Sequence, residues 1–270
     1  MTSPESTSNL HRALAPITAA AWAEIEEEAR RTFRRNVAGR RVVDVPDPEG
    51  PELSAVGTGH LSELTAPTPG VRARLREARP LVELRVPFTV DRAAVDDVER
   101  GSKDSDWQPV KDAARALALI EDRMVFEGYE AAGVEGCAPA APTRCCGCPR
   151  APRLPRRRQQ GPHLLRLAGV DGPYALLLGA DQYRAVSETS DHGYPIAAHL
   201  ARMLDGSPIW APALDGGFVL STRGGDFALR LGQDVAIGYT AHDADSVELY
   251  LQETLTFLAY TDEAVVVLEP

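Results

Sequence analysis

Two stretches of the chain carry apolar residues at the spacing of an α-helix. The first covers residues 18–36, where Thr18 can cap the first turn and arginines near the end suit the helix dipole. One face of this helix carries the apolar side chains Trp22, Ile25, Ala29 and Phe33. Because Gly39 follows closely, we expect an amphipathic helix that ends before this glycine.

The second stretch, residues 105–133, predicts a long central helix. Ser105 or Asp106 can accept the first free backbone N–H groups, and Pro109 fits the first turn, where its missing N–H is harmless. The apolar stripe consists of Val110, Ala113, Ala114, Leu117, Ile120 and Met124. Gly133 suits a left-handed cap at the end. Such a helix is about 40 Å long, so we expect a spine with structure packed around it.

A period of two predicts strands in other segments. Residues 81–90 alternate between apolar and polar, and three successive runs after residue 226 predict an antiparallel meander. The last run, residues 246–260, is well above the usual strand length of about five or six residues, so it needs long partners. Shorter strands are expected at residues 40–45, 174–178, 208–212 and 216–222, with helices beginning at Asp181 and covering residues 197–204.

Residues 46–80 have too little apolar content for a core of their own. Five prolines and three glycines lie between residues 46 and 69, around one short β-like piece. We expect an extended arm. Because ordering such an arm costs conformational entropy that its own contacts do not offset, we expect it to contact a neighbouring subunit.

Composition is that of a soluble globular protein, with 270 residues, 44% hydrophobic and 25% charged. The formal net charge of −10 repels nucleic acid and anionic membrane surfaces, so we expect neither as a partner. No window has the roughly eighteen continuous apolar residues of a membrane span. Residues 1–12 lack an apolar signal core, so a cytoplasmic location is expected.

The signatures of common enzymes are missing from the sequence. It contains no GxxxxGK[ST] loop, no GxSxG elbow and no HExxH helix. The glycines within residues 57–60 and 223–226 predict turns rather than phosphate loops. No two of the six histidines are spaced i, i+4 as in a helical metal pair. We therefore expect no catalytic residues, no metal site and no cofactor.

Residues 137–163 have a different character from the rest of the chain. They hold all four cysteines, are rich in Pro and Arg, and show no apolar period. We expect an irregular, surface-exposed segment whose cysteines are unpaired. A zinc knuckle built from Cys137, Cys145, Cys148 and His163 is the less favoured alternative, because a second closely spaced ligand pair is missing.

Several segments together resemble one family, the family 1 encapsulins. These segments are residues 10–18, 39–45, 81–104, the predicted spine helix, 171–179 and 223–257. The resemblance runs in order through nearly the whole chain except residues 137–163. A break at this one place, with the order resuming near Leu165, suggests the hypothesis of a compensated frameshift.

The resemblance implies an α+β fold, that of tailed-bacteriophage major capsid proteins, with a spine helix, a peripheral domain, an axial domain and an extended loop. The implied division is an N-terminal helix and first strand at 1–45, the extended loop at 46–80, the peripheral domain with the spine at 81–133, the axial domain at 134–222 and the peripheral meander at 223–270.

The resemblance also implies a function. Many copies of an encapsulin close into an icosahedral compartment around a cargo enzyme that carries a C-terminal targeting peptide. A dye-decolourising peroxidase is the expected cargo, with a ferritin-like protein as the alternative. The implied peptide-binding residues are Phe33, Val37, Arg40, Asp44, Asp234, Ile237 and Tyr239. An apolar patch rimmed by Arg and Asp suits an extended peptide, although core packing explains Phe33 and Ile237 equally well.

The resemblance also implies which residues line a pore of the shell. The loop 187–195 would line a five-fold pore, with Glu188, Asp191 and His192 forming its ring.

Some encapsulins bind flavin on an aromatic residue near the FTVD motif, but Arg92 and Ala93 follow this motif here, so no flavin is expected. A phage-type major capsid protein is the main alternative, and a hydrolase or a bacteriocin is less favoured.

Overall fold

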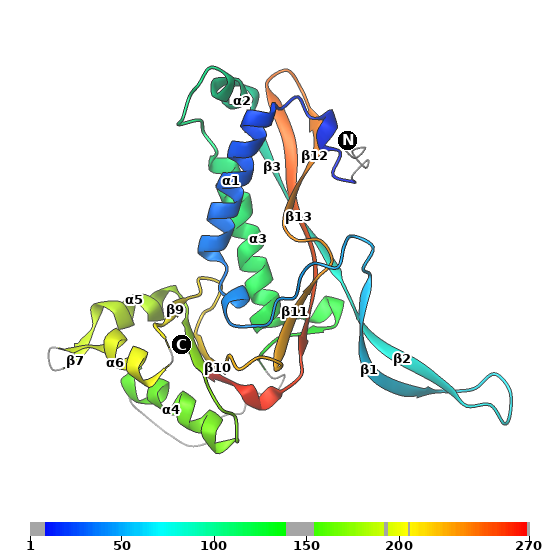
Figure 1. Ribbon diagram of the computed structural model, residues 1–270, viewed down its shortest axis with the longest axis vertical. Coiled ribbons are helices and arrows are strands. Elements are labelled where there is room, and N and C mark those ends of the chain that lie inside the picture. The colour runs from blue at the N-terminus through cyan, green and yellow to red at the C-terminus, as the bar shows by residue number, and fades with distance from the viewer. Residues whose placement is uncertain (1–8, 139–153, 192–193, 205, 269–270) are drawn as a thin grey trace, which may run out of the picture.

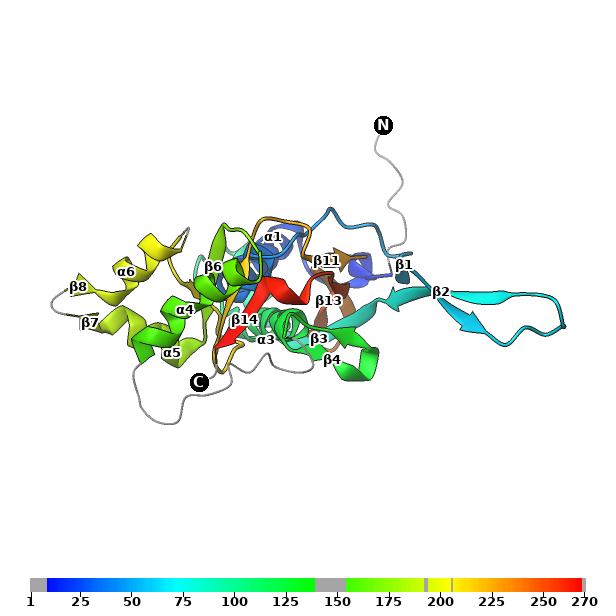
Figure 2. The ribbon, with the colours of Figure 1, turned by 90° about the horizontal axis from the view of Figure 1, so that it is seen from below.

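The computed structural model describes residues 9–138, 154–191, 194–204 and 206–268. Figure 1 shows helices α1 (Ala19–Asn36) and α3 (Gln108–Phe126) side by side along a long sheet, with a second lobe of shorter elements at one end. Figure 2 shows a hairpin that protrudes on the side opposite this lobe. The α+β class predicted from the sequence is confirmed.

Helix α1 forms where the apolar period predicts it. The hydroxyl of Thr18 accepts the N–H of Ala21 at 3.2 Å, which caps the first turn. Ile25 and Phe33 are buried against α3 and the sheet. After the helix, Gly39 opens a 3-10 turn, Gly39–Arg41, in place of the strand predicted over residues 40–45.

That predicted strand is wrong because side-chain contacts hold the backbone in a turn. The Asp122 carboxylate accepts the N–H of Ala38 at 2.9 Å and that of Gly39 at 2.7 Å. A Cβ on Gly39 would lie 3.1 Å from this carboxylate, so the residue allows a close approach. Only Asp44 adds to a sheet here, through one bridge to Ala228.

Helix α3 is shorter than predicted. The Asp106 carboxylate accepts the N–H of Gln108 at 2.9 Å, so the predicted start is confirmed, but the helix ends at Phe126. Gly128, at φ 84°, already turns the chain out of the helix, whereas Gly133 ends a short 3-10 helix, Glu130–Ala132. Ile120, expected in the buried stripe, is 36% exposed.

The main sheet is built around β13 (Ser246–Ala259), which confirms the expected long final strand. On one side β13 pairs antiparallel with β3 (Val82–Asp91) along its first ten residues. On the other side it pairs with β12 (Ala236–His242) and then with β11 (Phe227–Leu231). Helix α2 (Arg92–Glu99) follows β3, and the short strands β4 (Gly128–Tyr129) and β5 (Val134–Glu135) follow α3.

The second lobe contains a sheet in the order β14 (Val265–Leu268), β10 (Gly217–Ser221), β6 (Tyr174–Leu178) and β9 (Ile209–Trp210). Helices α4 (Leu154–Leu167), α5 (Ala180–Glu188) and α6 (Ile196–Met203) accompany it, with the two-residue strands β7 (Ser190–Asp191) and β8 (Tyr194–Pro195). The strands and helices predicted here are confirmed.

Helix α4 contradicts the prediction of irregular structure up to residue 163. Pro155 lies in the first turn, where proline is tolerated. Gly161 permits close packing, because a Cβ there would lie 2.7 Å from the Val219 side chain on β10. Since the residues as written form a helix, the frameshift hypothesis loses its basis.

The cysteine predictions fall mostly outside the described residues, because Cys145, Cys146 and Cys148 lie in 139–153. Cys137 is a free cysteine, and burial raises the pKa of its thiol above the ordinary value. No group of three or more potential metal ligands occurs in the described part of the chain, and none of its helices is long and apolar enough to cross a membrane.

The predicted arm is a two-stranded hairpin of β1 (Ala55–Leu64) and β2 (Ala73–Pro80). It extends well beyond the body of the subunit in Figures 1 and 2. Three of its leucines, Leu61, Leu64 and Leu75, are about half exposed. Apolar side chains on a protruding hairpin are typical of a surface that another chain covers.

Candidate functional site

Three elements meet near the C-terminal end of α1 and bring together most of the predicted peptide-binding residues. Phe33 and Val37 come from the end of α1, Arg40 from the 3-10 turn after it, and Ile237 from β12. Phe33, Val37 and Ile237 belong to one apolar cluster. The Arg40 guanidinium lies 4.9 Å from the centroid of the Phe33 ring.

Arg40 is occupied by acidic groups of its own chain. Its Nε and Nη2 donate to the Glu121 carboxylate at 2.9 and 2.7 Å, and Nη2 also lies 3.1 Å from Glu253. Its Nη1 donates to Asp234 at 2.8 Å. Burial opposes the charged form, yet the hydrogen bond and the charge of Glu121 raise the pKa of Arg40. Arg40 therefore links the turn after α1 to α3, β13 and Asp234. Its guanidinium donors are already directed at these acids rather than at a ligand carboxylate.

The acidic groups around Arg40 are deeply buried. Glu121, Asp122 and Glu253 are all 0% exposed. Burial, together with the charge and hydrogen bond of Glu121, raises the pKa of Glu253 well above its ordinary value. Burial also raises the pKa of Asp122 to about 7, against the opposing effect of the N–H groups of Gly39 and Ala38. More carboxylates than cations surround this turn, and both pKa shifts favour the protonated form of the acid.

The apolar members of the predicted site are part of the hydrophobic core. Phe33, Val37 and Ile237 are only 4–5% exposed. Trp22 of α1, Val235 before β12 and Tyr239 within β12 are among the half-buried side chains that pack against the same cluster. Tyr239 is further oriented by its hydroxyl, which lies 2.6 Å from Nδ1 of His242.

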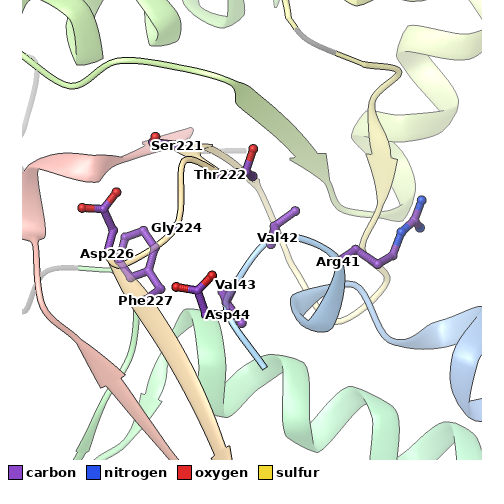
Figure 3. A pocket seen from close by; sticks show the side chains of 9 residues that line it. All are labelled: Arg41, Val42, Val43, Asp44, Ser221, Thr222, Gly224, Asp226 and Phe227. Carbon is purple, nitrogen blue, oxygen red and sulfur yellow. The ribbon is translucent and has the colours of Figure 1, made fainter. Parts of the chain in front are cut away.

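Asp44 lies in a separate hollow, shown in Figure 3. Its carboxylate accepts the N–H of Gly225 at 2.6 Å and so supports the predicted turn at 223–226. The hollow has a volume of about 120 Å³. It is lined by Arg41, Val42, Val43, Asp44, Ser221, Thr222, Gly224, Asp226 and Phe227. The structure thus assigns Asp44 to the junction between the loop after α1 and the turn before β11.

Sequence reasoning missed Glu121 and Asp122, which organise the turn after α1. The available signal was their position, since two adjacent acids lie in the middle of the apolar α3 pattern. Glu253, an acid on the otherwise apolar face of the last strand, is paired inside the sheet with Arg40 at 3.1 Å.

The predicted pore residues lie at the tip of the second lobe. Glu188 is the last residue of α5 and is exposed, and Asp191 lies in β7. Figure 2 shows β7 and β8 at the end of the molecule away from the β1–β2 hairpin. His192 lies outside the described residues.

Comparison with known proteins gives consistent results over nearly the full length. Residues 7–256 match the Linocin_M18 family, described as "Encapsulating protein for peroxidase". The chain is similar to the type 1 encapsulin shell protein of Mycobacterium tuberculosis, with 64% identity over 96% of this chain and 98% of the relative. The shell protein of Rhodospirillum rubrum is 44% identical over 96% and 95% of the two chains.

Solved structures that share little sequence identity with this chain have the same fold. A virus-like particle protein from Pyrococcus furiosus covers 92% of this chain and 99% of its own, with a TM-score of 0.66 at 15% identity. The capsid of a native GTA particle covers 98% of both chains, with a TM-score of 0.54 at 12% identity. The fold is therefore that of phage-type capsid proteins, and the chain belongs to the Linocin_M18 family of type 1 encapsulin shell proteins.

Proposed function

We propose that this chain is the subunit of a closed icosahedral shell that encloses a peroxidase bearing a C-terminal targeting peptide. The identity of 64% to a shell protein over nearly the full length of both chains carries this proposal. The protruding β1–β2 hairpin supports it, because its half-exposed leucines become buried when subunits assemble. The description of the matching family supports a peroxidase as the cargo.

We further propose that the targeting peptide binds beside the N-terminal helix. The surface consists of the accessible faces of Trp22, Val235 and Tyr239, with Asp234 at the rim. Phe33, Val37 and Ile237 form its apolar floor, and Arg40 fixes the turn at its end. An extended peptide with apolar side chains fits such a surface, since the floor excludes water and the rim supplies polar contacts.

The direct test is coexpression of the chain with a peroxidase from the same organism, with and without the C-terminal extension of that enzyme. We expect particles of megadalton mass in both cases, and peroxidase inside them only when the extension is present. Size-exclusion chromatography, negative-stain images and peroxidase activity of the particle fraction measure these outcomes. A monomeric subunit, or peroxidase retained without its extension, would contradict the proposal.

A variant at the rim locates the peptide surface. Phe33 and Ile237 are unsuitable for this test because a charge at either buried position destabilises the core. Val235→Asp places a charge on the half-buried surface instead, and we expect it to reduce peroxidase retention at least tenfold while shells still form. Asp245→Asn, in an exposed turn of the same sheet, is the control and should retain the wild-type load.

We propose that the tip of the second lobe lines the pore on the five-fold axis. Five copies of Glu188 and Asp191 would then attract cations and repel anions. Replacing both acids with lysine should slow the entry of cationic substrates and speed that of anionic ones. The rates at which loaded shells oxidise cationic and anionic peroxidase substrates measure this change in entry. If both rates are unchanged, the tip of the second lobe does not line the pore.

A cytoplasmic location and the absence of catalytic activity, flavin, nucleic acid and membrane partners remain predictions from the sequence.

A further inference from the structure

Strand β12 lies at an edge of the main sheet, because among the described strands its neighbour in the sheet order is β13 alone. The N–H of Tyr239 points away from β13, since it donates to the carbonyl of Leu10 at 2.9 Å. Main-chain groups of an antiparallel strand face alternate sides, so the N–H and carbonyl of Ile237 face the same outer side as those of Tyr239. This edge can therefore accept an extended segment.

Residues 9–14, which we call the N-terminal strap, already occupy part of this edge. Leu10 contributes the carbonyl bound by Tyr239, and its side chain is only 7% exposed. The Tyr250 hydroxyl reaches the carbonyl of Asn9 at 3.5 Å. An apolar side chain buried beside a main-chain hydrogen bond is how a peptide binds by strand addition. Figure 1 shows the N-terminal segment beside β12.

The other end of the strap is attached to α1. His11 has a φ of 52°, a left-handed conformation that is uncommon for a residue other than glycine, and it turns the chain into the 3-10 helix Arg12–Leu14. The Arg12 guanidinium pairs with Glu26 and lies 4.2 Å from the centroid of the Trp22 ring. The strap thus bridges β12 and α1, the two elements that border the proposed peptide surface.

The contacts that hold the strap on α1 are partly exposed to solvent. The side chains of Arg12 and Glu26 are 34% and 36% exposed, so solvent screens their attraction. Leu14 contributes little burial, because it is 67% exposed. The main-chain hydrogen bond to the edge and the burial of Leu10 help to offset the entropy of ordering the segment. Such a segment can be displaced by a competing strand of similar chemistry.

We propose that the N-terminal strap is an internal occupant of the cargo-peptide surface and competes with the cargo tail for the outer edge of β12. This inference rests on the proposed function. The inference adds to that function a description of the ligand. The ligand is an extended segment that adds to β12 through main-chain hydrogen bonds and inserts an apolar side chain where Leu10 lies. The side of the Trp22 ring that Arg12 now covers also becomes available to the tail when the strap leaves.

The first test uses a peptide taken from this chain. Leu10→Ala combined with Arg12→Ala loosens the strap in the full-length protein, and the probe is a fluorescent peptide with the sequence of residues 9–17. Subunits reassembled in the presence of the probe should bind it at least tenfold more tightly in the double variant than in the wild type. Arg30→Ala, which removes an exposed ion pair with Glu27 on the same helix, should match the wild type. Equal binding by the double variant and the wild type would overturn the proposal.

The second test measures cargo directly. At limiting peroxidase expression, Arg12→Ala shells should carry at least twice the peroxidase per subunit of wild-type and Arg30→Ala shells. An equal or lower load would show that the strap does not compete. If wild-type shells retain no peroxidase at all, the proposed function fails instead, while the peptide experiment still decides whether the edge of β12 accepts a strand.

Discussion

Arg40→Met should lower the stability of the subunit more than any surface substitution. Methionine has similar length but no charge, so Glu121 and Glu253 are left buried without a cation. Breaking a buried ion pair in this way costs about 3–5 kcal/mol. We expect a lower midpoint of thermal unfolding and fewer shells, with partial recovery at low pH, where Glu253 is protonated.

The adjacent arginine provides the control. Arg41 is exposed and lies on the rim of the hollow in Figure 3, so Arg41→Met should change stability by less than about 0.5 kcal/mol. Adding Glu121→Gln and Glu253→Gln to Arg40→Met should restore much of the loss, because the neutral amides no longer need a cation. If Arg40→Met is as stable as the wild type, the buried cluster is not what fixes the turn after α1.

Glu253→Gln should make the stability of the shell less dependent on pH. The raised pKa of Glu253 means that the folded state holds a proton the unfolded state releases near pH 4.5, and Asp122 behaves in the same way from pH 3.8 to about 7. Their contribution is complete below the unfolded pKa values and is lost as pH rises through the folded ones. Wild-type stability should therefore decline from mildly acidic to alkaline pH.

The amide introduced by Glu253→Gln reproduces the protonated acid, since it can donate to Glu121 and it carries no charge to desolvate. At pH 9 the variant should have a higher unfolding midpoint than the wild type, because burial disfavours the ionised form of Glu253 that the unfolded chain adopts freely. Unfolding midpoints of shells between pH 5 and pH 9 measure the effect. Glu248→Gln, on an exposed position of the same strand, is the control. Parallel pH profiles for wild type and Glu253→Gln would mean that Glu253 is ionised throughout.

Local patterns in the sequence were sufficient where packing and local preference agree. Helix α1 carries its own cap at Thr18 and its own apolar face, and β13 keeps its alternation over its full length. Helix α4 lacks an apolar period and packs through Gly161 against Val219, a contact between residues distant in sequence. Residues 40–45 have strand-like composition, but Asp122 binds the backbone just before them and imposes a turn.

The site was only partly predictable for a related reason. Among the residues that the resemblance implied, Phe33 contacts Arg40 and shares an apolar cluster with Ile237, but the sequence could not show which of their atoms remain accessible. Burial depends on what covers a side chain, and here the covering groups come from α3 and β13. Asp44 was grouped with this set although its contacts belong to the hollow beside Gly225.

The length of β13 also has a thermodynamic consequence. Val247, Leu249 and Leu251 belong to the apolar cluster shared with α1, whereas Leu255 and Phe257 belong to the cluster of the second lobe. One uninterrupted strand thus supplies side chains to both clusters, and its pairing with β3 runs from Ser246 to Leu255, so the two clusters share one main-chain support. Amide protons in the two lobes should exchange with solvent in one cooperative unfolding event rather than in two.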